Sequence, residues 1–137
     1  MQLIIVESPT KARTLTRFLN GKGDYRIEAT MGHVRDLPKA TLGVDVEHDF
    51  SPSYIIPKLK QKRVGELKAI AKKADSIILA TDPDREGEAI AWHVAQILAH
   101  RSPLSPSGLG TRASSKKKKK AESGVLKADR FKRIVFH

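Results

Sequence analysis

Two acidic clusters each come directly after a short apolar run of the chain. Glu7 follows the first run, and Asp82, Asp84 and Glu86 follow a second one. If both runs are strands, these side chains lie beyond strand carboxyl ends, where ligands of open α/β sheets bind. Crowded carboxylates repel one another unless a cation neutralises them. Their all-oxygen chemistry suits a hard ion, so the pattern indicates a Mg²⁺ site, with Mn²⁺ as a substitute.

An ordinary structural explanation competes with the metal site. Acidic side chains are common in the first turn of a helix, where they complement the helix dipole. Asp82-Pro83 is also a typical turn pair. An isolated Asp-x-Asp would favour this explanation. Glu7, at the end of another predicted strand and beside Ser8 and Lys11, favours a site instead.

Hydrophobic periodicity and capping residues predict the elements that position these groups. Ser8 can cap a helix whose first position is Pro9 and which ends before Asn20-Gly21. Strands are predicted at 2–6, 25–31, 76–81 and 130–136, further helices at 59–74 and 86–100, and loops with one or two short strands at 34–57. Strand–helix units in series indicate an α/β fold with a mainly parallel sheet flanked by helices.

Several ring side chains call for a structural interpretation. Trp92 and the helix face around it are expected in the core, and so is Tyr25, which alternates with strand positions. His93 lies on the apolar side of its helix and is expected to be a core or supporting group rather than a ligand. Tyr54 stands between prolines in a loop.

The positive charge of the chain is concentrated at one end. The 137 residues carry a net charge of +11, of which residues 1–100 contribute +2 and residues 101–137 contribute +9. Residues 102–124 are rich in Ser, Pro, Gly and Lys and are predicted to be a flexible insertion that includes the run Lys116 to Lys120. Such charge is compatible with a nucleic-acid partner, although a lysine run is more often simply solvated.

Composition excludes several classes of function. The chain has no cysteine, which excludes a disulfide scaffold, a Cys-ligated zinc site and a thiol nucleophile. The longest apolar runs are too short to span a bilayer, and no signal peptide is expected at Met1. We therefore expect a soluble cytoplasmic domain without a membrane partner.

Three longer motifs resemble a known family. Glu7 together with Asp82-x-Asp84-x-Glu86 resembles the Toprim domain of topoisomerases, bacterial primases and some nucleases. The strings from Val6 to Ala12, from Gly32 to Pro38 and from Thr81 to His93 resemble, in this order, the amino terminus of type IA DNA topoisomerases. Residues 131–137 resemble the strand that follows in that family. The resemblance implies a single Toprim domain over 1–137, with a Rossmann-like sheet.

The resemblance also implies roles for individual residues. In the family, the residue matching Glu7 lies close to the scissile phosphate and takes part in proton transfer. The lysine matching Lys11 stabilises negative charge on that phosphate. The acidic triad matching Asp82, Asp84 and Glu86 binds Mg²⁺, with Glu7 beside it. A catalytic and DNA-contacting role is implied for Arg85, and contacts with the DNA backbone are implied for His33 and Arg35.

The family cleaves one DNA strand by tyrosine attack, forms a 5′-phosphotyrosine, reseals the strand and thereby relaxes negative supercoils. Neither Tyr25 nor Tyr54 lies in a context that resembles the nucleophile. We therefore expect the nucleophile in downstream domains of a longer enzyme, and we expect this chain to be inactive alone. The parent is expected to be a monomer that acts on single-stranded DNA in the bacterial nucleoid.

Two alternatives remain open at this point. A Toprim nuclease or primase-like domain would use the same carboxylates for hydrolysis or nucleotidyl transfer. A non-enzymatic, basic DNA-binding module would owe most of its affinity to the lysine run.

Overall fold

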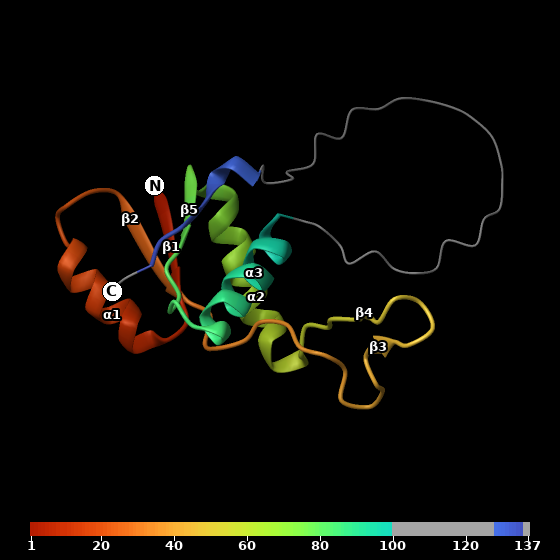
Figure 1. Ribbon diagram of the computed structural model, residues 1–137. Helices are drawn as coiled ribbons and strands as arrows, with labels where there is room; N and C mark the ends of the chain where they lie inside the picture. Colours follow the sequence, from red (N-terminus) through yellow and green to blue (C-terminus); the bar gives the residue numbers. More distant parts are fainter. Residues whose placement is uncertain (100–127, 136–137) are drawn as a thin grey trace, which may run out of the picture.

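A four-stranded parallel sheet forms the centre of the molecule (Figure 1). The computed structural model describes residues 1–99 and 128–135. The sheet has the order β2-β1-β5-β6, in which β1 is Gln2–Val6, β2 is Tyr25–Ala29, β5 is Ser76–Leu79 and β6 is Phe131–Arg133. Each neighbouring pair is parallel. This sheet confirms the predicted fold class.

Helices cover both faces of the sheet. Helix α1 (Pro9–Leu19) lies on one face, whereas α2 (Lys58–Lys73) and α3 (Arg85–Leu98) lie together on the other (Figure 1). The side chains of β1 alternate accordingly: Leu3 and Ile5 join the core under α2 and α3, and Ile4 and Val6 join the core under α1. A strand buried on both faces must be apolar throughout, which explains the continuous run in the sequence.

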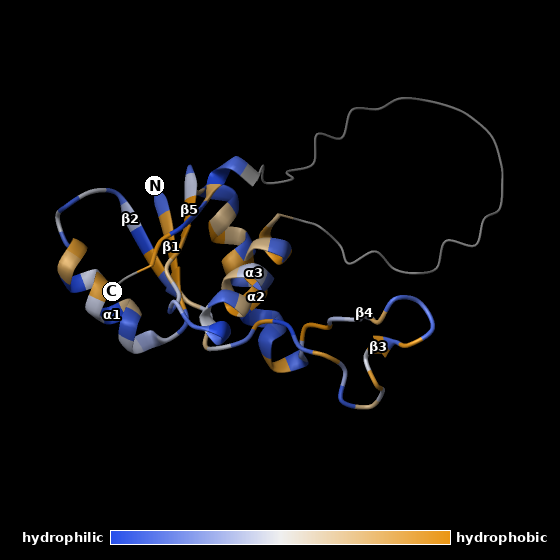
Figure 2. Cartoon of the chain, viewed as in Figure 1, coloured by the Kyte–Doolittle hydropathy of each residue, from blue (hydrophilic) through white to orange (hydrophobic). Residues whose placement is uncertain are grey.

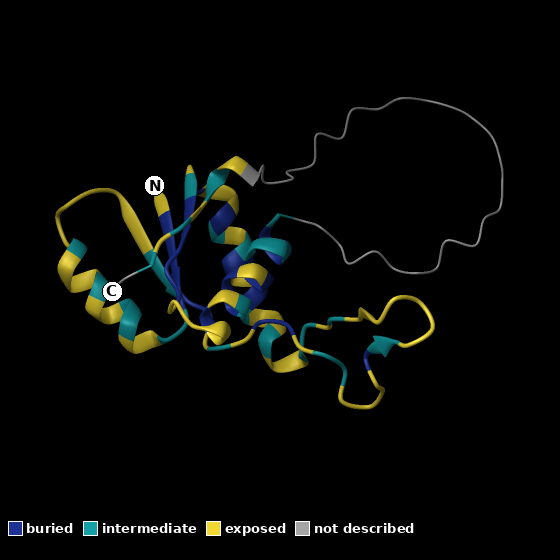
Figure 3. Cartoon of the chain, viewed as in Figure 1, coloured by how far each residue is buried: buried dark blue, intermediate teal, exposed yellow. Residues whose placement is uncertain are grey.

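The two cores differ in size and in depth. The core under α2 and α3 is the larger one and includes the fully buried side chains of Leu67, Ile77 and Ile90. Helix α1 buries no residue completely and packs through the partly buried Ala12, Leu15 and Leu19. Figure 2 shows the apolar residues of the strands, and Figure 3 shows that the deeply buried positions gather in the sheet and on α2 and α3.

A small arm projects from the body between β2 and α2. It contains the two-residue strands β3 (Val44–Asp45) and β4 (Ser51–Pro52), which pair antiparallel. The arm is largely exposed (Figure 3). One bridge, from Asp36 to Ile55, closes its base next to the body. These short strands agree with the loops predicted for 34–57.

The predicted elements are all present, with ends that differ by a few residues. Two predicted core residues were wrong: the side chain of Trp92 is 49% exposed and that of Tyr25 is 37% exposed. Tyr25 begins an edge strand, and Trp92 lies on the side of α3 that faces away from the sheet core.

The predicted insertion at 102–124 and residues 136–137 lie outside the described residues. No helix among the described residues is long and apolar enough to cross a membrane.

Candidate metal and phosphate site

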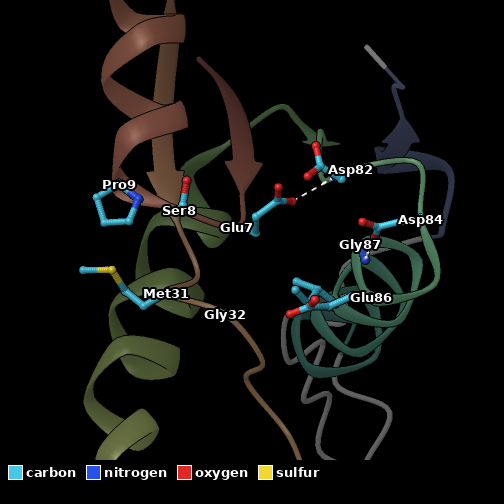
Figure 4. A pocket seen from close by; sticks show the side chains of 10 residues that line it. Glu7, Ser8, Pro9, Met31, Gly32, Asp82, Asp84, Glu86 and Gly87 are labelled. Atoms are coloured by element: carbon cyan, nitrogen blue, oxygen red, sulfur yellow. Dashed lines mark hydrogen bonds between the residues drawn. The ribbon is translucent and has the colours of Figure 1, made fainter. Parts of the chain in front are cut away.

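A cleft of about 530 Å³ opens beyond the carboxyl ends of β1 and β5 (Figure 4). Glu7, Asp82, Asp84 and Glu86 all line it. We call this feature the acidic cleft; its other lining residues are Ser8, Pro9, Met31, Gly32, Gly87 and Ile90. The parallel order of β1 and β5 therefore brings the two acidic clusters of the sequence to one cleft.

The carboxylate of Glu7 connects the ends of the two central strands. Its Oε2 accepts a hydrogen bond of 2.9 Å from the backbone N–H of Asp82, which Figure 4 shows as a dashed line. Its Oε1 accepts a hydrogen bond from Nζ of Lys11. The side chain of Glu7 is only 17% exposed. A half-buried carboxylate with two donors is held in one orientation toward the cleft.

Lys11 owes its position to the start of α1. Ser8 caps this helix, its hydroxyl accepting from the backbone N–H of Lys11 at 3.3 Å, and Pro9 occupies the first turn. One turn beyond Glu7, the Lys11 ammonium forms ion pairs with Glu7 and with Asp82. These partners raise the pKa of Lys11, and Lys11 lowers the pKa of Asp82. The ammonium thus supplies the positive charge that neighbouring carboxylates require.

Asp84 caps the second helix that points at the cleft. Its Oδ1 accepts a 2.7 Å hydrogen bond from the backbone N–H of Gly87 at the start of α3. Thr81 donates its hydroxyl to the carbonyl of Gly87 at 2.6 Å. A Cβ at Gly87 would lie 2.0 Å from the carbonyl oxygen of Asp82, so only glycine fits here. The strand end and the helix start are therefore packed backbone against backbone.

Arg133 on β6 fastens this same junction and was missed in the sequence. Its guanidinium donates to the carbonyl oxygens of Leu79 and Asp82, both at 3.0 Å. It also forms an ion pair of 2.7 Å with Glu88. The only signal in the sequence was a cation in the last predicted strand, and its partners lie far away in the chain.

The opposite wall of the acidic cleft is formed by the turn after β2. Met31 and Gly32 both have positive φ angles, 63° and 86°. The carbonyl of Glu7 accepts from the N–H of Gly32 at 3.0 Å, so this turn is fastened to the end of β1. His33 follows, with Nε2 3.7 Å from Oε1 of Glu86. The structure therefore brings His33 to the rim of the cleft, while Arg85 is an exposed residue at the start of α3.

Arg35, for which a DNA contact was predicted, lies inside the protein instead. Its side chain is 6% exposed, and its Nε donates to Nδ1 of His93 at 3.0 Å. Its guanidinium carbon lies 4.9 Å from the ring centroid of Tyr54 and 5.2 Å from that of Trp92. We call these four residues the aromatic cluster. The arm carries Arg35 and Tyr54 against α3, so this cation faces rings rather than solvent.

Burial sets the protonation of the aromatic cluster. Desolvation lowers the pKa of His93 to about 4, with the charge of Arg35 as a further cause. His93 is therefore neutral at pH 7. This agrees with its hydrogen bond, because only a neutral ring has a nitrogen that can accept from the Arg35 N–H. Burial also lowers the pKa of Arg35. The expectation that His93 is a core group is confirmed by its 7% exposure.

The oxygen atoms that line the acidic cleft are of the type that binds a hard divalent cation. Asp82, Asp84 and Glu86 offer carboxylate oxygens to one cleft, and Lys11 already places a positive charge beside Asp82. Within residues 1–99 and 128–135, no three acidic or histidine side chains converge as a ready ligand set. Metal binding would therefore require the side chain of Asp82 to exchange Lys11 for the ion.

Comparison with known proteins places this geometry in a family. A family model described as "Toprim domain" matches residues 2–114. A protein named "DNA topoisomerase 1" from Synechocystis is 53% identical over 117 residues, which is 75% of this chain and 13% of that protein. A protein of the same name from Synechococcus elongatus is 53% identical over 116 residues, 74% of this chain and 13% of its own length.

A solved structure of a topoisomerase is also similar to this chain. The structure of full-length topoisomerase I from Thermotoga maritima is similar with a TM-score of 0.65 and 49% sequence identity. The match covers 70% of this chain and 16% of that one. The chain thus spans a small fraction of the length of these relatives.

Proposed function

Because the chain belongs to the Toprim domain family, in the form found in bacterial DNA topoisomerase I, we propose that it is the Mg²⁺-binding catalytic part of a type IA topoisomerase. The parent enzyme would cleave and rejoin one DNA strand in the bacterial cytoplasm and so relax negative supercoils. The observation that supports this most is the acidic cleft, which is lined by Glu7, Asp82, Asp84 and Glu86 and has Lys11 paired with two of them.

Each side chain of the acidic cleft has a part in this proposal. Asp82, Asp84 and Glu86 would hold Mg²⁺, which when bound supplies positive charge to the DNA phosphate. Lys11 would turn from Asp82 to the phosphate and stabilise its negative charge. His33 and Arg85, at the rim and at the start of α3, would contact the DNA backbone.

Glu7 would move the proton that strand cleavage requires. A tyrosine outside this chain attacks the phosphorus, so that a phosphotyrosine bond forms as the bond to the 3′ oxygen breaks. The tyrosine loses its proton and the leaving 3′ oxygen gains one. Glu7, only 17% exposed and lining the cleft, would take up the proton that the tyrosine loses and pass it to that oxygen. Resealing reverses each of these changes.

Titration with Mg²⁺, followed by backbone amide NMR, tests the metal site. We expect the largest shift changes at residues 82–86 and at Glu7. The variant Lys11→Met should bind Mg²⁺ more tightly, because it frees Glu7 and Asp82 from their present cation. Asp84→Asn should bind it more weakly while keeping the helix cap, since asparagine caps as well as aspartate does.

Glu88→Gln provides the matched control. Glu88 lies on α3 near the other carboxylates but pairs with Arg133 and does not line the cleft. Its removal should leave the Mg²⁺ response unchanged. Shift changes that avoid residues 82–86 and Glu7 would show that the site is assigned wrongly.

The nuclease alternative makes a different prediction. A hydrolytic domain would nick single-stranded DNA with Mg²⁺ and without a tyrosine, whereas this chain should leave the DNA intact. Nicking by the wild-type chain that disappears in Asp84→Asn would favour the nuclease.

A further inference from the structure

Trp92 is unusual among the large side chains of α3. Its indole is 49% exposed, whereas the neighbouring Ile90, Ala91, His93 and Val94 are buried. Exposing half of the largest apolar side chain forgoes hydrophobic stabilisation that burial would provide. A ring kept in this position therefore calls for a reason outside the packing of the body.

The exposed indole is held firmly in place. Its ring centroid lies 5.8 Å from that of Tyr54 and 4.9 Å from that of His93, with an interplanar angle of 67° in both pairs. Both contacts have edge-to-face geometry, which favours a fixed ring orientation. A surface ring that is already ordered loses little conformational entropy when a second flat ring stacks on it.

A positive charge without a carboxylate partner lies beside this ring. The guanidinium of Arg35 is 5.2 Å from the indole centroid, and its Nη2 is buried without a hydrogen-bond partner. Among the residues that the structure describes, no acidic side chain forms an ion pair with Arg35. A buried cation of this kind favours an anionic ligand nearby, because its charge is poorly screened.

The aromatic cluster lies about two helical turns along α3 from Glu86, a residue that lines the acidic cleft. Arg85 and Trp92 are seven residues apart, which corresponds to about 10 Å along the helix axis. His93, in contact with Trp92, follows Glu86 by nearly two full turns and so lies on the same side of α3 as that cleft residue. A DNA strand whose phosphate lies beside Arg85, at the start of α3, would reach Trp92 within about three stacked nucleotides.

We propose that Trp92, supported by Tyr54, His93 and Arg35, is a stacking platform for one base of a single-stranded DNA whose backbone enters the acidic cleft. The proposal rests on the proposed function, since it takes the cleft as the place of the phosphate. An exposed and ordered aromatic ring offers a stacking surface to a flat base. The buried charge of Arg35, which the rings shield from direct contact, favours a ligand that carries negative charge. A stacking platform predicts little sequence preference, because every base offers a flat face.

The fluorescence of Trp92 tests this directly, since it is the only tryptophan of the chain. A thymine oligonucleotide should quench the indole emission at low salt. An abasic oligonucleotide of the same length and charge should bind through its phosphates but leave the emission unchanged. Equal quenching by both oligonucleotides, or no quenching up to millimolar oligonucleotide, would overturn the platform.

Substitution separates stacking from charge. Affinity measured by anisotropy of a labelled thymine oligonucleotide should fall about tenfold in Trp92→Leu and much less in Trp92→Phe. The salt dependence should keep its slope, since no phosphate contact is lost. Phe18→Leu is the matched control, because Phe18 is 66% exposed on α1, on the other face of the sheet. Amide spectra of each variant establish that the fold is kept.

The outcome is independent of the metal test. Loss of the Mg²⁺ response at residues 82–86 with retained base quenching would contradict the proposed function and leave the platform standing. Equal affinity of Trp92→Leu and wild type would contradict the platform alone. Self-association of the wild-type chain that Trp92→Leu abolishes, without base quenching, would instead identify a protein contact surface and refute it.

Discussion

The acidic cleft and the aromatic cluster hold their positive charges in opposite ways. In the cleft, the exposed Lys11 pairs with the half-buried Glu7 and the exposed Asp82, at a surface where water and ions can replace the lysine. In the cluster, the charge of Arg35 is buried between rings, and its hydrogen-bond partner is the neutral ring of His93. The comparison shows why the cleft is suited to exchanging ligands. The cluster, whose partners cannot be replaced by water, is suited to holding a surface in place.

The backbone junction beneath the cleft should show the largest response to mutation. Gly87→Ala places a methyl group 2.0 Å from the carbonyl oxygen of Asp82, so the strand end and the start of α3 must move apart. We expect a loss of about 4 kcal/mol in the free energy of unfolding, measured by denaturant titration.

Gly65→Ala is the control for that measurement. Gly65 lies on the exposed side of α2, and no atom outside its own helix lies within 4 Å of the place where an alanine Cβ would be, so alanine should stabilise the helix by about 1 kcal/mol. A Gly87→Ala variant as stable as wild type would show that the end of β5 and the start of α3 can move apart freely. The acidic cleft would then lack a rigid base.

Acid should destabilise the protein through the aromatic cluster. His93 faces Arg35, His33 and Asp36, and its pKa of about 4 lies below the ordinary value of 6.5. Between these values the unfolded chain binds a proton that the folded chain does not. The contribution of neutral His93 to the free energy of unfolding is therefore fully present above pH 6.5. It falls by about 3 kcal/mol as the pH drops to 4.

His93→Gln isolates this contribution. Glutamine can still accept the hydrogen bond of Arg35 but does not titrate, so the variant should lose less stability than wild type between pH 6.5 and 4. Denaturant titrations at several pH values measure both proteins, and an identical pH dependence would contradict the assignment to His93.

The smallest of the three effects is expected at the edge of the sheet. Arg133→Met removes the hydrogen bonds to the carbonyls of Leu79 and Asp82 and should cost about 1.5 kcal/mol. It should also increase amide hydrogen exchange in the loop after β5. Lys132→Met, on the exposed neighbouring residue, should change neither quantity. Unchanged exchange in Arg133→Met would mean that the junction holds without β6.

Local patterns in the sequence were sufficient for most of the fold. Ser8 and Pro9 predicted the start of α1, because a side-chain oxygen and a fixed φ angle suit a helix amino terminus wherever it lies in the chain. The short apolar run at 2–6 predicted a strand, and the structure shows that β1 is buried on both faces. The resemblance drawn from three motifs is confirmed by the family match over residues 2–114.

The placement of the carboxylates followed from the same reasoning. Glu7 and the group at Asp82 each follow a strand, and parallel strands end at the same edge of a sheet, so their meeting in one cleft could be predicted. The roles assigned to these residues came from the resemblance and stay predictions.

Tertiary structure alone decided which charges are paired and which rings are covered. Lys11 meets Asp82 across 71 residues of sequence, and Arg133 reaches the carbonyl of Asp82 across 51. General burial tendencies place tryptophan inside and arginine outside. The arm reverses this, because it folds Tyr54 and Arg35 against α3 and leaves one side of Trp92 open. The burial of Arg35 and the exposure of Trp92 depend on contacts between distant segments, which no local pattern contains.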